Sequence, residues 1–264
     1  MKRPKRTLFD SFNLDAPHVT EARRLLQTLA RRERDESNPP KVYMVTSASR
    51  GEGKSTICGL VSMVAARIFR RKTLVIDADL RRPSLHSLLG LNQRPGLAEL
   101  MEGSASVEEA TRSTLIGTLS AIPSGRPTKS VGDTYDDFAF RELLDQFRPQ
   151  YDLIFIDCPP VVPVMEPLLI AEHVDALLLV AMAGATQVTM IRRMRQILAP
   201  LESKIAGAIL NNATDGLPYY YDYRYYGYES PKPKRVREIR TPAAKPPAAD
   251  DAAARHVARE RGGA

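Results

Sequence analysis

Residues 48–56 read Ala-Ser-Arg-Gly-Glu-Gly-Lys-Ser-Thr and lie between a β-rich run and a helical one. Gly51 and Gly53 allow the backbone to curl so that its N–H groups converge on phosphate oxygens, helped by the N-terminus of the following helix. Lys54 is placed to neutralise the β- and γ-phosphates of a nucleotide, and the Ser55 hydroxyl to ligate magnesium. These residue types, in this strand-and-helix context, predict a phosphate-binding loop, or P-loop.

The first residue of this loop departs from the strict pattern. Ala48 stands where a glycine is usual, but its small side chain still permits a tight turn. The alternative interpretation is a glycine-rich turn without a ligand. It is disfavoured by the strand before the loop and by the helical face after it, which carries Ile57, Leu60, Val61, Val64 and Ile68.

Three aspartates at the ends of apolar runs could complete a nucleotide site. Asp157 ends the run "LIFID", while "TLVIDADLRRPSLH" carries Asp77 and Asp79 two residues apart, a spacing that puts both carboxylates on one side of an extended chain. The carboxyl ends of parallel strands share one edge of a sheet, so all three are expected beside the P-loop. Of the paired acids, one could hold metal while the other accepts a hydroxyl proton. An acidic strand-to-loop turn is the alternative.

Alternating β-rich and helical segments must position these residues. The runs "VYMVTS", "TLVIDAD", "LSAIPSG", "DLIFIDCPP", "ALLLVA" and "IAGAILNN" are apolar on both faces, as expected for parallel strands covered by helices. Residues 41–215 are therefore predicted to form a doubly wound α/β domain with a mainly parallel sheet. Residues 1–18 are expected to be a flexible N-terminal arm. Residues 19–36 are expected to be a helix with one apolar face, made of Val19, Ala22, Leu25, Leu26 and Leu29.

The charge distribution argues against a nucleic-acid groove. The chain has 264 residues, 43% of them apolar, and a formal net charge of +7. Residues 1–6 carry +4 and residues 231–264 carry +5, so residues 7–230 carry −2. The basic ends are interpreted as solvated tails, or as contacts for anionic lipid or an acidic partner, and no nucleic-acid partner is expected.

The sequence carries no pattern for a membrane span, a secretion signal or a metal cluster. The longest apolar run, "ALLLVAMAGA", is about half of the roughly 20 residues that span a bilayer. The basic start is followed by no apolar h-region, so no signal peptide is expected and the protein is expected in the cytoplasm. Cys58 and Cys158 are expected to be buried thiols, and the four histidines are scattered.

Six segments in a fixed order resemble those of a known family. They are "SASRGEGKST", "LVIDADLRRPSLH", "GLAELMEG", "AIPSG", "YDLIFIDCPP" and "LLLVAMAGATQ", and they are similar to the bacterial tyrosine autokinases of capsule and exopolysaccharide export, the BY-kinases. The resemblance covers residues 21–212 and extends through a tyrosine-rich stretch to Tyr228. It implies a P-loop NTPase fold of the deviant Walker A type, as in the partition ATPases, and an ATP- and Mg²⁺-dependent protein-tyrosine autokinase.

The resemblance also implies roles for individual residues. Ser55, Asp79 and Asp157 would hold the metal. The expected catalytic residues are Lys54, Asp77 and Asp79, with Asp77 as the base for a tyrosine hydroxyl and an exchange of roles between the two acids left open. Asn211 or Asn212 would contact the adenine. The expected nucleotide-binding residues are Ser49, Arg50, Gly51, Glu52, Gly53, Lys54, Ser55, Thr56, Asn211 and Asn212.

The tyrosine-rich stretch, residues 218–230, would be the substrate of the kinase. Its tyrosines are expected to enter the active site of a neighbouring subunit, and each phosphate adds about −1.5 to −2 charges, which would favour dissociation of a ring. An aromatic interface patch is the alternative, disfavoured by the interspersed charged residues. The expected phosphoacceptors are Tyr219, Tyr220, Tyr221, Tyr223, Tyr225, Tyr226 and Tyr228. Residues 231–264 are expected to be a disordered basic, Pro- and Ala-rich tail.

Two features of the family pattern remain open in this chain. In the family, an early helix carries Glu, then Arg three and six residues later, and joins neighbouring subunits. Glu21 and Arg24 fit this pattern, and Gln27 stands at the third position, so the 19–36 helix is an expected oligomerisation helix, with ring formation left open. Arg81 and Arg82 would either steady phosphate charge or cap the turn.

The expected partners follow from the split form of the family, which the chain resembles because it has no membrane span. There, a separate transmembrane adaptor, the polysaccharide co-polymerase, holds the kinase at the inner face of the membrane and completes its nucleotide site. A cognate tyrosine phosphatase is also expected. The rival hypotheses are a kinase-dead scaffold and a partition- or positioning-type ATPase switch without tyrosine phosphorylation. Such ATPases carry a signature lysine where this chain has Ser49.

Overall fold

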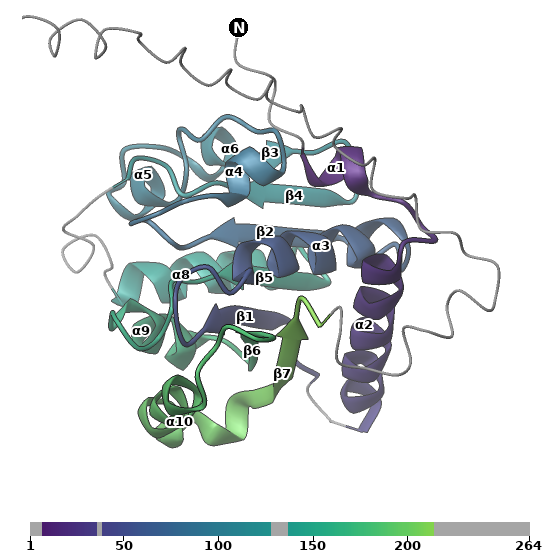
Figure 1. Ribbon diagram of the computed structural model, residues 1–264. Coiled ribbons are helices and arrows are strands. Elements are labelled where there is room, and N and C mark those ends of the chain that lie inside the picture. The colour runs from purple at the N-terminus through teal and green to yellow at the C-terminus, as the bar shows by residue number, and fades with distance from the viewer. Residues whose placement is uncertain (1–6, 36–38, 128–136, 214–264) are drawn as a thin grey trace, which may run out of the picture. The chain divides into compact units, whose positions relative to one another are not determined.

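The computed structural model describes residues 7–35, 39–127 and 137–213, and a seven-stranded sheet lies at its centre (Figure 1). The strands are β1 (Val42–Ser47), β2 (Thr73–Asp77), β3 (Arg112–Ser113), β4 (Leu119–Ile122), β5 (Leu153–Asp157), β6 (Ala176–Met182) and β7 (Ile205–Asn211). Their order is β3-β4-β2-β5-β1-β6-β7, and neighbours run parallel except β3, which is antiparallel to β4. The predicted doubly wound, mainly parallel α/β fold is confirmed.

Helices cover both faces of the sheet. They are α1 (Leu8–Ser11), α2 (Pro17–Asp35), α3 (Lys54–Arg67), α4 (Leu85–Leu88), α5 (Leu97–Met101), α6 (Val107–Ala110), α8 (Asp137–Phe147), α9 (Glu166–His173), α10 (Val188–Ile197) and the 3-10 helix η1 (Ala199–Lys204). Side chains of α1 to α4 join one buried cluster, and those of α5, α8, α9 and α10 join another. The sheet lies between two helical layers, as its apolar strands require.

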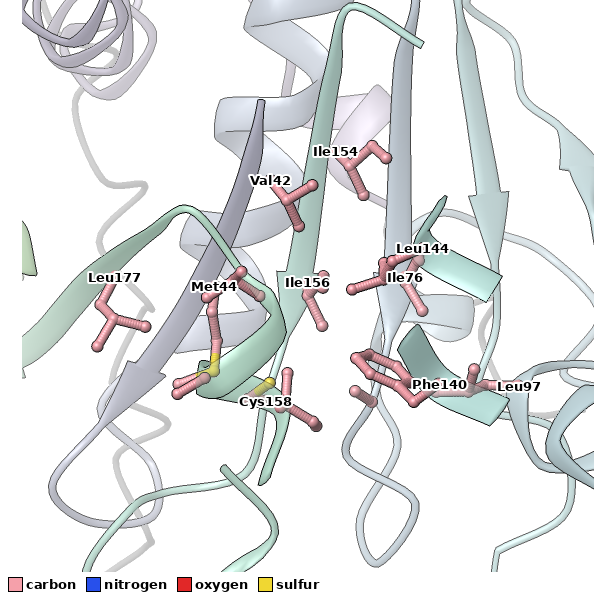
Figure 2. Packing of buried hydrophobic residues seen from close by; sticks show 14 of the residues in the cluster. Val42, Met44, Ile76, Leu97, Phe140, Leu144, Ile154, Ile156, Cys158 and Leu177 are labelled. Carbon is pink, nitrogen blue, oxygen red and sulfur yellow. The ribbon is translucent and has the colours of Figure 1, made fainter. Parts of the chain in front are cut away.

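Strand β1 illustrates why these runs form central strands. Val42 and Met44 pack into one buried cluster while Tyr43 and Val45 pack into the other, because successive side chains point to opposite faces. Figure 2 shows part of the first cluster, where Met44 lies between Leu177 of β6 and Ile156 of β5, and the side chains of β2 and α8 lie on the other side of Ile156. Cys58 and Cys158 are both fully buried free thiols, which confirms the prediction made for them.

The strand order brings the ends of β1, β2 and β5 together. β5 lies between β2 and β1, and Asp77 at the end of β2 is in register with Asp157 at the end of β5. Asp157 is also in register with Val45 of β1, two residues before that strand ends. The loop after β1 therefore leaves the sheet beside both acidic strand ends.

The N-terminal residues differ from the expected flexible arm. Within residues 7–18, α1 is capped by Thr7 and Asp10, and Leu8, Phe9 and Phe12 pack against the cluster of α2 and α3. Such a short helix has no apolar periodicity, so the pattern could not predict it. Helix α2 buries Val19, Ala22, Leu26 and Leu29, as expected for one apolar face, while Glu21 and Arg24 form an exposed pair at 2.6 Å.

Several sequence-based expectations fall outside the described residues. The tyrosine-rich stretch at residues 218–230, the tail at residues 231–264 and the first six residues of the arm are among them. Within the described ranges, no helix combines the length and the apolar character that crossing a membrane requires.

The first prediction concerns the packing of α8. Phe140 is 2% exposed and Phe138, two residues earlier, is 67% exposed. Phe140→Ala should lower the free energy of unfolding by about 3–5 kcal/mol because it leaves a cavity in the core. Phe138→Ala, the matched control, should change it by less than about 0.5 kcal/mol. Urea denaturation of both variants measures this, and equal effects would contradict the packing described.

Candidate functional site

The loop between β1 and α3 has the backbone shape of an anion-binding loop. Gly51 and Gly53 adopt φ values of 79° and 87°, in the left-handed region that favours glycine, and α3 begins directly afterwards at Lys54. The N–H groups of the first turn of α3 have no partners within the helix and can bind an anion. The local structure is the one that the glycine spacing predicts.

A cavity of ≈ 360 Å³ lies beside this loop. It is lined by Arg50, Gly51, Gly53, Lys54, Ser55, Thr56, Asp79, Arg81, Arg82, Ser84, Leu88, Pro159, Pro160, Pro163 and Val164. The lining combines the P-loop, the segment after β2 and the segment after β5. Cations and hydroxyls predominate among its polar groups, which suits a phosphate ligand.

Lys54 is held by the carboxylates around it. Its Nζ lies 3.0 Å from Oδ2 of Asp79, and both side chains are largely buried. Burial lowers the pKa of Lys54, but the negative charges of Asp157 and Asp79 outweigh this and raise the pKa above its ordinary value. The protonated form of Lys54 is therefore favoured, and Lys54 places a positive charge at the cavity.

The side chain of Asp77 is fully buried, and backbone N–H groups hold its carboxylate. Its Oδ1 accepts the N–H of Asp79 at 3.2 Å, and its Oδ2 accepts those of Ser84 and Leu85 at 3.2 and 3.1 Å. Burial, followed by the charge of Asp157, raises the pKa of Asp77 well above its usual range, although the N–H of Leu85 opposes the shift. Asp77 is a neighbour of Asp79, as the spacing predicts, but only Asp79 lines the cavity.

Asp157 is a fully buried carboxylate whose oxygens accept no hydrogen bond from the described residues. Burial raises the pKa of Asp157 to about 6, while the charge of Lys54 and the nearby hydroxyl of Ser55 oppose the shift. A buried acid without donors is costly unless a cation is supplied. Within the described ranges, His, Cys, Asp and Glu form no group of three that could hold a metal by themselves. Mg²⁺ fits such a site, because it binds through one or two carboxylates together with phosphates and water.

The two arginines after Asp79 have different surroundings. Arg81 donates to Oε1 of Glu166 through Nε at 3.0 Å and Nη2 at 2.5 Å, and Glu166 is 3% exposed. The backbone N–H of Arg82 donates to Oδ1 of Asp79 at 3.0 Å. Both arginines line the cavity. The segment thus caps its own turn through the backbone, and both arginines remain beside the cavity.

Glu52 holds the P-loop in place through hydrogen bonds to three other residues. It is 4% exposed, and its carboxylate accepts the N–H of Ser49 at 2.9 Å and the hydroxyl of Thr186 at 2.6 Å. Its backbone carbonyl accepts Nδ2 of Asn211 at 3.0 Å. Glu52 therefore braces the P-loop against the end of β7 and the segment that leads into α10.

The structure separates the predicted site residues into two groups. Arg50, Gly51, Gly53, Lys54, Ser55, Thr56 and Asp79 line the cavity, whereas Ser49, Glu52, Asp77, Asp157, Asn211 and Asn212 lie around it and do not line it. Three lining prolines at positions 159, 160 and 163 were not predicted as site residues, although two of them belong to the quoted "IDCPP" segment. Thr186 was also not predicted as a site residue, although it belongs to the quoted "LLLVAMAGATQ" segment.

Among curated proteins, the chain is similar to tyrosine kinases of bacteria. It is 31% identical over 187 residues to tyrosine-protein kinase YwqD of Bacillus subtilis, an alignment that covers 71% of this chain and 78% of YwqD. It is 29% identical over 188 residues to tyrosine-protein kinase wzc of Salmonella typhi, again over 71% of this chain, but spans only 26% of wzc. No family model matches the chain.

Solved structures show the same relationship. The kinase domain of the Escherichia coli tyrosine kinase ETK has a TM-score of 0.68 and 27% identity, covering 73% of this chain and 74% of that one. The septum site-determining protein MinD of Pyrococcus horikoshii, complexed with Mg-ADP, has a TM-score of 0.57 and 21% identity, covering 69% and 76%. At that identity, MinD shows the P-loop ATPase fold alone.

The second prediction concerns the contact between Gly53 and Asn211. A Cβ on Gly53 would lie 2.1 Å from Nδ2 of Asn211, whereas one on Gly51 would have no heavy atom within 4 Å. Gly51→Ala should cost about 1–2 kcal/mol of stability from its positive φ alone. Gly53→Ala should cost about 1 kcal/mol more, because the Asn211 amide must move aside and lose its hydrogen bond to the carbonyl of Glu52.

The clash can be isolated by a double-mutant cycle. In an Asn211→Ala background, Gly53→Ala should cost no more than Gly51→Ala does. Chemical denaturation of the four variants and the wild type gives these differences. An excess cost of Gly53→Ala that persists without the Asn211 side chain would show that the contact is not the cause.

Proposed function

The chain belongs to the bacterial tyrosine-protein kinases, and from this premise we propose that the cavity beside the P-loop is its active site. The reaction moves the terminal phosphoryl group of ATP to a tyrosine oxygen, releases ADP and transfers the hydroxyl proton to a base. The observation that carries the assignment is the meeting of Lys54, Asp79 and the fully buried carboxylate of Asp157 at one sheet edge.

The P-loop side of the cavity is proposed to hold the phosphates. Lys54 would turn from Asp79 to the β- and γ-phosphates, while Ser55, Thr56 and the backbone N–H groups of the first turn of α3 bind phosphate oxygens. Ser55, Asp79 and Asp157 would hold Mg²⁺, which supplies positive charge to the phosphate oxygens when bound. Asn211 and Asn212 follow at the end of β7 and are proposed to contact the adenine.

Asp77 is proposed as the base that takes the tyrosine proton. Its raised pKa makes the ionised carboxylate a better proton acceptor than an ordinary aspartate. To act, it must release the N–H groups of Ser84 or Leu85, which occupy its Oδ2 in this structure. Asp79 lines the cavity and is the candidate for an exchange of roles.

The proposed phosphoacceptors are the seven tyrosines between Tyr219 and Tyr228. They begin eight residues after Asn211, whose side chain contacts the P-loop backbone. Eight residues can span at most about 29 Å, and this length limits how far the first tyrosine can lie from the P-loop. Transfer is proposed to occur between subunits, with α2 and its Glu21–Arg24 pair at the contact between copies.

The proposed setting is the assembly of capsule or exopolysaccharide. It rests on the resemblance of the six sequence segments to the polysaccharide-export kinases. In this setting, a separate transmembrane adaptor holds the kinase at the inner face of the membrane, and a tyrosine phosphatase reverses the modification. The positioning-ATPase alternative has weaker support, because the similarity to MinD extends only to the fold.

The third prediction tests the autokinase. The full-length protein, incubated with ATP and Mg²⁺ with and without the cytoplasmic segment of a candidate adaptor, should carry phosphate on tail tyrosines. Lys54→Met should lower this at least about 100-fold, since it removes a charge at the transferred phosphate. Mass spectrometry locates the sites, and a variant with phenylalanine at all seven positions is the acceptor control. ATP hydrolysis without tyrosine modification, even with the adaptor segment, would favour the positioning ATPase.

The same variants test transfer between subunits. Lys54→Met retains the tyrosines, and the seven-phenylalanine variant retains the active site. Mixing the two should restore phosphate on the Lys54→Met chains if transfer occurs between subunits. Phosphorylation of the wild type without phosphorylation in the mixture would instead indicate transfer within one chain.

The fourth prediction separates the two acids after β2. Asp77→Asn should lower the phosphorylation rate at saturating ATP about 100-fold or more while changing the affinity for Mg-ADP less than about threefold, because it removes only the proton acceptor. Asp79→Asn should weaken the Mg²⁺-dependent part of ADP binding as well. Titration with and without Mg²⁺, beside rate measurements, distinguishes them. The opposite pattern would mean that the acids have exchanged roles.

A further inference from the structure

Glu52 joins three segments that are distant in the sequence. Its backbone carbonyl receives Asn211 of β7, and its carboxylate receives Ser49 of the P-loop and Thr186 of the segment before α10. Thr186 lies 134 residues from Glu52 along the chain. Although Glu52 lies in the P-loop, between Gly51 and Gly53, it does not line the cavity.

Thr186 has a hydroxyl with a fixed direction. Its Oγ1 accepts the N–H of Met182, the last residue of β6, at 2.8 Å. The hydroxyl proton is then directed to Oε1 of Glu52, where the separation is 2.6 Å. The backbone N–H of Thr186 also donates to the carbonyl of Met182 at 2.9 Å, which closes a tight turn after β6. The threonine is therefore a rigid donor anchored on the central sheet.

The carboxylate of Glu52 connects Thr186 to the backbone of the P-loop. One oxygen takes the Thr186 proton, and the other holds the N–H of Ser49 at 2.9 Å. Because Glu52 is 4% exposed, an oxygen that lost its donor would be left without water as a substitute. The least costly response is rotation of Glu52, which would release Ser49 and alter the backbone on either side of Glu52.

We propose that Thr186 is a positioning residue of the kinase, which acts through Glu52 to hold the P-loop backbone in its phosphate-binding shape. This rests on the proposed function, since it assumes that the P-loop binds the phosphates of ATP. Thr186 lies outside the cavity lining, so its effect falls on nucleotide affinity and not on the chemical step.

The test compares variants of the full-length protein by the dissociation constant for Mg-ADP, measured with a fluorescent ADP analogue. Thr186→Val has nearly the shape of threonine but cannot donate, and its dissociation constant should rise about tenfold or more. Thr186→Ser keeps the hydroxyl and should stay within about twofold of the wild type. The phosphorylation rate at saturating ATP should change less than about threefold in both.

A matched control removes a threonine hydroxyl elsewhere. Thr111 is half-buried like Thr186 and donates to the carbonyl of Val107 at 2.7 Å, at the end of α6. Thr111→Val should leave the dissociation constant unchanged. If it weakens binding as much as Thr186→Val does, or if Thr186→Ser is as weak as the valine variant, loss of stability is the cause and the inference is overturned.

The proposed function can fail separately from this inference. Lys54→Met should abolish tight Mg-ADP binding whatever Thr186 does. If Lys54→Met loses binding while Thr186→Val binds as the wild type does, the positioning role is wrong and the active-site assignment stands. If Lys54→Met binds Mg-ADP as tightly as the wild type, the assignment of the P-loop as the phosphate site is wrong. The positioning role of Thr186 is then wrong as well.

Discussion

One lysine faces three buried carboxylates at the edge of the sheet, and the site depends on this imbalance of charge. Lys54 pairs directly with Asp79, while Asp77 and Asp157 raise its pKa from further away. Burial, followed by repulsion among acids that a single cation does not compensate, raises the pKa values of Asp77 and Asp157 as well. Burying three carboxylates beside one lysine destabilises the protein, and the arrangement becomes favourable only when a further cation binds.

The parallel sheet creates this concentration of charge. Because β2, β5 and β1 are neighbours and point the same way, the residues after each strand meet at one edge. This geometry also explains why the sequence could predict so much. Apolar runs that end in Asp77 and Asp157, and a glycine loop that follows another run, require only the rule that parallel strands share a carboxyl edge.

The remaining parts of the site depend on contacts that no local pattern encodes. Glu52 and Thr186 are 134 residues apart, and Arg81 and Glu166 are 85 residues apart. The spacing of Asp77 and Asp79 predicted that they lie close together. It did not predict that the carboxylate of Asp77 accepts hydrogen bonds from the N–H groups of the following turn. Helix α1 was missed for a related reason, since four residues are too few for periodicity to appear.

If Lys54 binds phosphate and Asp79 binds metal, as proposed, the ion pair between them couples the two binding events. If Lys54 turns from Asp79 to a phosphate, the Asp79 side chain, which is 6% exposed, keeps the N–H of Arg82 among the described residues. A buried carboxylate that loses its cation is destabilising by several kcal/mol, roughly 3–5 in measured cases. Under the proposed assignment, a divalent metal would take the place of Lys54 at Asp79 and would satisfy the neighbouring Asp157 as well. A nucleotide that bound without metal would draw Lys54 away and leave the Asp79 carboxylate without a cation. Under the proposed assignment, the charge arrangement therefore favours joint binding of the metal and the nucleotide.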